Sequence, residues 1–112
     1  MMSGRLRHKL DIQQLVAGSP DQTPEGEPDE SWTVFLNDIW AAVEPLSGRE
    51  LFAAQEHHSE IQVRIRVRYR TGITAKMRAV FESRNYNILA VIDREERHRE
   101  LELLCSEGLN EG

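Results

Sequence analysis

Hydrophobic and polar residues alternate most regularly in one stretch of the chain, Ile61–Gly72. The apolar side chains there are Ile61, Val63, Ile65, Val67 and Tyr69, and the polar ones are Gln62, Arg64, Arg66, Arg68 and Arg70. Such a period of two predicts a β-strand, in which successive side chains point to opposite faces. The strand therefore has an apolar face, which needs a core, and an arginine face, which needs water, acidic partners or phosphates.

Similar patterns, separated by turn residues, predict further strands. Arg5–Leu15 alternates and should place His8 on its apolar face, as a core or rim histidine. Trp32–Val43 favours two short strands or one bent strand that ends before Pro45, because the residue before a proline leaves the helical region. Trp32 and Trp40 are expected as core or interface anchors.

The C-terminal half predicts a hairpin and a last strand. Lys76–Glu82 and Tyr86–Asp93 flank a predicted turn at Ser83–Asn85. After a polar connection, Leu101–Cys105 favours a final strand, although the spacing of its leucines also fits a helix. Ser106–Gly112 is expected to fray.

One helix is predicted, over Leu46–Ser59. Ser47 and Glu50 have the spacing of a capping box, and Leu46 and Leu51 that of a hydrophobic staple. A helix this short needs a surface to dock on. Strands with turn signals and one helix predict a mainly β fold, a small antiparallel barrel or sandwich with long loops. The arginine strand should be central, with Glu100–Glu102 opposite it.

Composition fits a single domain over residues 1–112, with 39% hydrophobic and 29% charged residues. Neither a secretory signal nor an apolar run long enough to cross a bilayer is expected, which suits a cytoplasmic product. The net charge is −5, and acidic and basic residues are concentrated in different parts of the chain. Ala17–Ser31 contains prolines, glycines and acids, which predicts a long, mobile loop that is either functional or a tolerated insertion.

Catalysis has little support, because the chain lacks the glycine-rich phosphate loop and the common hydrolase motifs. His57 and His58 are adjacent and would point about 100° apart on a helix, so no metal site and no cofactor are expected. Cys105 favours a buried structural thiol.

The arginine face is the main candidate for binding. Side chains on one face of a strand repeat every ~6.6–6.8 Å, near the spacing of phosphates along a nucleic acid strand. Aromatic residues make up only 6% of the chain, and Tyr69 lies on the opposite face, so stacking platforms are scarce. The alternative is a sheet face neutralised by glutamates.

An ordered series of residues resembles the head–tail adaptor family of long-tailed bacteriophages, the small head-completion or stopper proteins. The series covers nearly the whole chain and consists of Gly4, Leu6, Arg7, His8, Leu10, Ile12, Gln13, Trp40, Ala41, Val43, Pro45, Gly48, Glu50, Arg68, Arg70, Gly72, Ile73, Met77, Arg78, Tyr86, Ile88, Leu101, Leu103 and Cys105. The segment Ser19–Glu30 is where this chain looks individual.

The resemblance implies a small β-barrel that assembles as a homo-oligomeric ring in the virion neck, made in the host cytoplasm. Its partners would be a portal or connector protein, a tail completion or tail tube protein, and passing DNA without sequence specificity, and it would have neither catalytic residues nor membrane contact. The free protein should be a monomer. The alternative is an oligonucleotide-binding barrel that uses Arg64–Arg70. Candidate interface residues are Arg5, Arg7, Arg49, Phe52, Arg64, Arg66, Arg68 and Arg70. Candidate channel or docking residues of the acidic loop are Asp21, Glu25, Glu27, Asp29 and Glu30.

Overall fold

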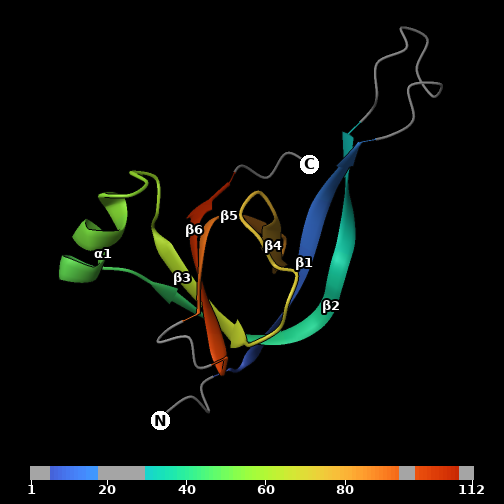
Figure 1. Ribbon diagram of the computed structural model, residues 1–112, viewed down its shortest axis with the longest axis horizontal. Coiled ribbons are helices and arrows are strands. Elements are labelled where there is room, and N and C mark those ends of the chain that lie inside the picture. Colours follow the sequence, from blue (N-terminus) through green and yellow to red (C-terminus); the bar gives the residue numbers. More distant parts are fainter. Residues whose placement is uncertain (1–5, 18–29, 94–97, 109–112) are drawn as a thin grey trace, which may run out of the picture.

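The computed structural model describes residues 6–17, 30–93 and 98–108. The elements in these residues are β1 (His8–Ala17), β2 (Glu30–Pro45), α1 (Gly48–Gln55), β3 (Val63–Arg68), β4 (Arg78–Phe81), β5 (Arg84–Asp93) and β6 (Glu100–Glu107). The strands pair in antiparallel fashion and close a barrel in the order β1-β2-β3-β6-β5-β4 (Figure 1). The prediction of a mainly β fold with one short helix is confirmed.

The barrel interior is filled by the apolar faces that alternation predicted. Ile65 and Val67 of β3 are fully buried, and so is Ala79 of β4. Met77 and Phe81, which share the side of Ala79, pack against the same core. Completing the core are Leu10, Ile12, Ile39, Ala41, Val63, Ile73, Tyr86, Ile88, Leu101, Leu103 and Cys105.

The arginine strand lies between two neighbours, as predicted. β3 pairs with β2 on one side and with β6 on the other. Arg66 faces Glu102 and Arg68 faces Glu100 in the β3–β6 register. Opposite charges directly across an antiparallel pair stabilise it, so the acidic strand settles beside the arginine strand. The open choice at the C-terminus is thereby decided in favour of a strand.

The helix forms a second, smaller core outside the barrel. Leu46, Ala54 and Ile61 are buried together, and Leu51 packs against them. The helix is shorter than predicted, and Ser47 is its N-cap without a side-chain hydrogen bond, so the predicted capping box is wrong. The physical reason lies in tertiary structure, because the Glu50 carboxylate binds Arg64 instead of the helix N-terminus.

Several predicted boundaries also need correction. Of the two predicted alternatives, β2 is the single bent strand, but it does not end before Pro45, which pairs with Val63. Its bend falls near Asp38, which has a positive φ of 55°. The hairpin turn is one residue earlier than predicted, at Glu82–Ser83, where both residues have positive φ as a tight two-residue hairpin turn requires.

Strand ends lie further out than the sequence indicated. β1 runs to Ala17 and β2 starts at Glu30, so the loop between them is shorter than predicted. β6 continues to Glu107, into the part of the chain that was expected to fray. By contrast, β3 occupies only Val63–Arg68 of the alternating stretch.

β1 and β2 extend past the rest of the barrel as a two-stranded ribbon, on the side of the molecule away from α1 (Figure 1). β4 pairs with β1 only over Asp11–Gln13, whereas β1 pairs with β2 as far as Ala17. The outer part of the ribbon therefore has a sheet neighbour on one side only. At its base, Phe35 packs against Gly72, where an added Cβ would lie 2.7 Å from the Phe35 ring.

Candidate interface surfaces

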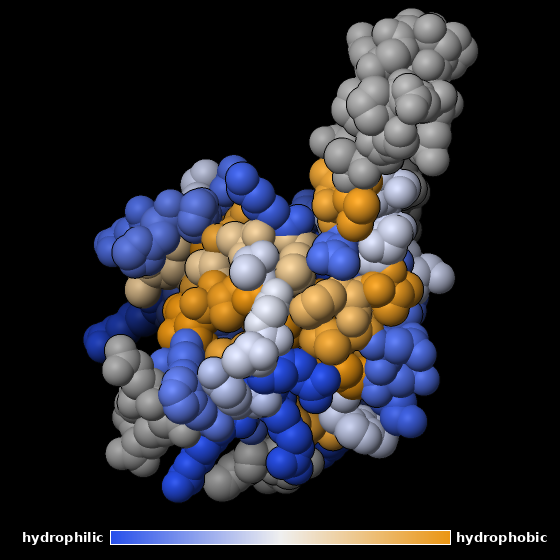
Figure 2. Space-filling model, turned by 45° about the vertical axis from the view of Figure 1, so that its right-hand side comes forward, coloured by the Kyte–Doolittle hydropathy of each residue, from blue (hydrophilic) through white to orange (hydrophobic). Residues whose placement is uncertain are grey.

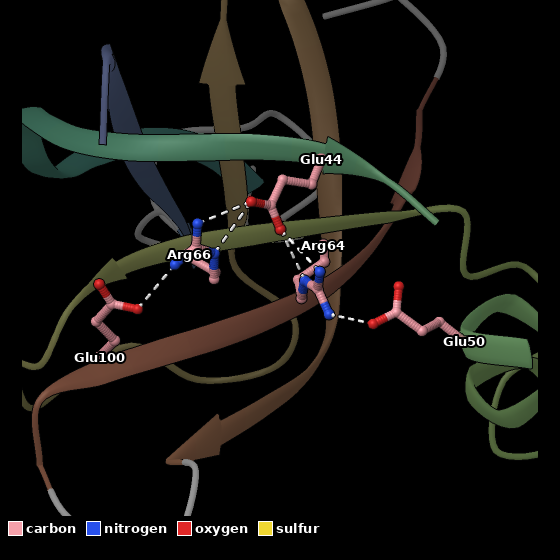
Figure 3. Close-up of polar contacts among 5 residues, drawn as sticks. All are labelled: Glu44, Glu50, Arg64, Arg66 and Glu100. Atoms are coloured by element: carbon pink, nitrogen blue, oxygen red, sulfur yellow. Dashed lines mark hydrogen bonds and ion pairs between the residues drawn. The ribbon is translucent and has the colours of Figure 1, made fainter. Parts of the chain in front are cut away.

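Two arginines of β3 are held in a network of glutamates (Figure 3). Glu44 of β2 accepts hydrogen bonds from both, from Arg64 Nε at 3.0 Å and from Arg66 Nη2 at 2.8 Å. Arg64 Nη1 also binds Glu50 of α1 at 3.0 Å, and Arg66 Nη1 binds Glu100 of β6 at 3.1 Å. The network thus connects three strands and the helix on the outer face of the barrel.

Glu44 is the electrostatic centre of this network, because both arginines bind it. Hydrogen bonds from Arg66 lower the pKa of the Glu44 carboxyl below its ordinary value of 4.5; partial burial opposes this shift and Arg64 adds to it. Both guanidiniums use several N–H groups on carboxylates, the geometry in which arginine binds most strongly. Arg64 and Arg66 are therefore neutralised by glutamates, as the alternative interpretation of the arginine face required.

The remaining arginines of the row differ from this pair. Arg68, at the end of β3, is exposed. Arg70 follows the strand, and its Nε is buried with no hydrogen-bond partner among the described residues. The structure therefore does not present four equivalent arginines on one open face.

An exposed tryptophan lies beside this face, although the sequence pattern indicated that stacking platforms are scarce there. Trp40 of β2 is 50% exposed, so it is not a core residue. Lys9 pairs with Trp40 in the β1–β2 register, and its Nζ lies 4.9 Å from the centroid of the indole ring. Ala41 follows Trp40 and pairs with Val67, which precedes Arg68, so Trp40 and Arg68 belong to the same end of the β2–β3 pair.

A second exposed surface lies on the ribbon. The Arg78 guanidinium stacks over Trp32 at 4.2 Å from its ring, and Arg78 Nε donates to Gln13 Oε1 at 2.7 Å. Three large apolar side chains of the ribbon are exposed to solvent, namely Leu15, Val16 and Val34. Figure 2 shows hydrophobic surface on the upper right of the described part of the chain, where the ribbon of β1 and β2 lies.

The helix carries a third exposed surface. Phe52 is 72% exposed, and Arg49 is exposed one turn earlier. His8, predicted on an apolar face, is also exposed, with its ring 4.9 Å from the ring of Phe81. Of the two predicted places, core or rim, His8 takes the rim, because it stands at the very start of β1.

Several predicted site residues lie outside the described residues, namely Arg5, Asp21, Glu25, Glu27 and Asp29. Glu30 is the first residue of β2, and Arg7 is exposed just before β1. The structure therefore brings Arg64 and Arg66 together with acids, leaves Arg7, Arg49, Phe52 and Arg68 on the surface, and does not describe most of the acidic loop.

Cys105 is fully buried, as predicted, and burial raises the pKa of its thiol to about 12. Within the described ranges, no group of three or more His, Cys, Asp or Glu residues could hold a metal ion. Among the same residues, no helix is long and apolar enough to cross a membrane.

The sequence as a whole matches a family model. The model is described as phage head completion protein, and it matches residues 1–108. The chain belongs to this family. It is 29% identical over 113 residues to the head completion protein gp7 of Enterobacteria phage HK97, an alignment that covers 96% of this chain and 97% of that protein. Members of the family are structural components of the phage particle, and the resemblance inferred from the sequence is confirmed.

Two solved structures share the fold of this chain. The solution structure of protein SF1141 from Shigella flexneri 2a has 31% sequence identity and a TM-score of 0.77, over 99% of this chain and 100% of that chain. A chain in the virion of a native gene transfer agent particle has 18% identity and a TM-score of 0.58, over 91% of this chain and 94% of that chain. The second likeness shows a shared fold.

Sequence reasoning missed Lys9 and undervalued Trp40. The alternation in β1 puts Lys9 on the polar side of its strand, and this position could have been inferred from the sequence. The register that sets it against Trp40 and Arg68 joins three strands far apart in sequence. Such a register depends on the irregularities in β1 and β2, which leave no clear trace in the sequence.

Proposed function

We propose that this head completion protein forms a ring in the neck of a long-tailed phage, between the portal or connector and the tail. In this role it completes the filled head and helps to retain the packaged DNA. The observation that carries the proposal is the family match over residues 1–108. The protein would be made in the host cytoplasm and would act without catalysis.

The distribution of exposed apolar residues supports a ring of identical subunits. A closed ring needs two different patches on each subunit, one for each neighbour. The ribbon, with Leu15 and Val34, and the helix, with Phe52, lie on different sides of the barrel (Figure 1). These patches are small, so the free protein should be a monomer that assembles on the portal or connector.

The acidic segment Ser19–Glu30 is the part we assign to DNA passage or docking. It contains five acids and no base. Negative charge repels a DNA backbone, so the segment would act as a low-friction lining or as an arm that docks on a basic neighbouring surface. Deleting it should leave thermal stability nearly unchanged and alter DNA retention or tail attachment. Unfolding of the shortened protein would show that the segment belongs to the core.

The oligonucleotide-binding alternative has less support. It needs the arginine row to be free for phosphates, and Arg64 and Arg66 already bind three glutamates. A steep salt dependence with sub-micromolar affinity for single-stranded DNA would favour it. Weak binding would favour the adaptor.

The deciding experiment is an image of the particle at a resolution that places this chain, together with particles that lack it. We expect a ring between the portal and the tail, and heads without it that lose DNA or fail to join tails. Sedimentation of the purified protein should show a monomer. A chain found elsewhere in the particle would refute the proposal.

A further inference from the structure

Four residues form a basic surface around an exposed indole, which we call the basic-aromatic patch: Arg7, Lys9, Trp40 and Arg68. Lys9 lies over the Trp40 ring, and Arg68 lies at the end of β3, directly after Val67, which pairs with Ala41, the residue after Trp40. Arg7 is exposed two residues before Lys9. The three cations come from the start of β1 and the end of β3, and they meet only in the folded barrel.

The cations of this patch are open for binding. Lys9 and Arg68 make no ion pair with the residues that the structure describes, in contrast to Arg64 and Arg66 nearby. Glu100 faces Arg68 in the register, but its carboxylate binds Arg66. A ligand that carries negative charge and a compact apolar ring would satisfy both the cations and the half-exposed indole.

One segment of this chain has that chemistry. Ser19–Glu30 reads SPDQTPEGEPDE, and each of its prolines is followed by an acid. Proline-rich segments adopt an extended conformation and dock their rings on exposed aromatic side chains. The acids between them would reach the cations on either side of Trp40. Charge and shape thus point to the same occupant.

Within its own chain the segment could bring at most its tip near the patch. Ala17 pairs with Glu30, so residues 18–29 leave and return at one point. Half of such a loop extends at most ~20 Å, at ~3.4 Å per residue. Lys9 lies eight strand residues before Ala17, ~26 Å away at ~3.3 Å per residue. A segment that lays several of its proline–acid pairs along the patch must therefore come from a second copy.

We propose that the basic-aromatic patch of one copy binds the Ser19–Glu30 segment of a neighbouring copy. This contact rests on the proposed ring and would give it a direction, because each subunit offers an arm to one neighbour and a patch to the other. Binding to DNA is disfavoured by the net charge of −5 and by the presence of a single indole in the patch.

The direct test is titration of a peptide, residues 19–31 with blocked ends, into the full-length protein, followed by NMR. We expect the indole N–H signal of Trp40 to shift and that of Trp32 to stay. A peptide whose acids are replaced by amides should bind at least about fivefold more weakly, and so should the double variant Lys9→Ser, Arg68→Ser. Arg49→Ser, which removes an exposed arginine from α1, is the matched control and should change affinity less than about twofold.

Three results would overturn the proposal. These are no shift at Trp40, equal affinity for the amide peptide, and displacement of the peptide by a single-stranded thymidine oligonucleotide that binds more tightly. The last result would assign the patch to nucleic acid. Thermal melting of each variant checks that the barrel is intact, so a loss of binding can be assigned to the patch.

A second test separates this proposal from the ring itself. Particles that carry Arg68→Cys and Glu25→Cys should form disulfide-linked chains under mild oxidation, and either single variant should not. Cys105 will not interfere, because its thiol is buried. A ring seen by imaging without cross-links or peptide binding would refute the contact and keep the proposed function. Peptide binding without a ring in the particle would refute the proposed function instead.

Discussion

Removing the charge of Glu44 tests whether the arginine–glutamate network stabilises the barrel. Glu44→Gln keeps the size of the side chain and abolishes two ion pairs, with Arg64 at 2.9 Å and Arg66 at 2.8 Å. Each arginine keeps one other acid, Glu50 or Glu100. The variant therefore removes only part of the network, and the side chains that lose an ion pair are mostly buried.

The expected cost follows from that intermediate burial. The side chains of Arg64 and Arg66 are 19% and 17% exposed, and that of Glu44 is 30% exposed. Exposed pairs contribute about 0.2–1 kcal/mol each, and breaking a fully buried pair costs about 3–5 kcal/mol. Two half-buried pairs, partly screened by water, should lower the free energy of unfolding by about 1.5–3 kcal/mol.

Urea denaturation at pH 7, with Glu60→Gln as the control, measures this difference. Glu60 is exposed, and none of its contacts in the structure is an ion pair with a described residue. The control should change stability by less than about 0.5 kcal/mol. Equal free energies of unfolding for Glu44→Gln and Glu60→Gln would refute the assigned role of Glu44.

The pH dependence gives an independent check. The folded-state pKa of Glu44 is lowered, first by hydrogen bonds from Arg66, so its contribution is fully present above the ordinary value of 4.5. It is lost as the pH falls through the lowered pKa. The gap between the wild type and Glu44→Gln should therefore be constant above 4.5 and shrink below it. A gap that persists undiminished at strongly acidic pH would contradict the electrostatic explanation.

Three further predictions concern other parts of the fold. Ser47→Ala should cost less than about 0.5 kcal/mol in thermal melts, below the ~0.5–2 kcal/mol of a working N-cap, because Ser47 makes no side-chain cap bond; a larger loss would show that the cap forms in solution. Cys105 should resist thiol reagents at pH 8 in the native protein and react fully in urea, since burial raises its pKa to about 12; rapid native labelling would contradict its burial. Gly72→Ala should cost about 1–3 kcal/mol, because φ is +99° and the new Cβ would lie 2.7 Å from the Phe35 ring, and an unchanged urea midpoint would refute this packing.

The sequence by itself determined the β class, the central arginine strand and its acidic neighbour. Alternation in Ile61–Gly72 is a local property that any half-buried strand must show, so Ile65 and Val67 could be assigned to the core directly. The family followed from an ordered series of residues along the chain, and it needed no contacts to be recognised.

Tertiary structure decided how the charged side chains are used. Glu50 has the spacing of a helix cap, yet it binds Arg64, because the fold brings a guanidinium within 3.0 Å of it. The register between β1 and β2 places Lys9 over Trp40, and that between β2 and β3 brings the end of β3, before Arg68, to Ala41. Local pattern fixes which face of a strand a residue is on. Which residues share that face across strands depends on register, bulges and barrel closure, and these arise only when the whole chain packs.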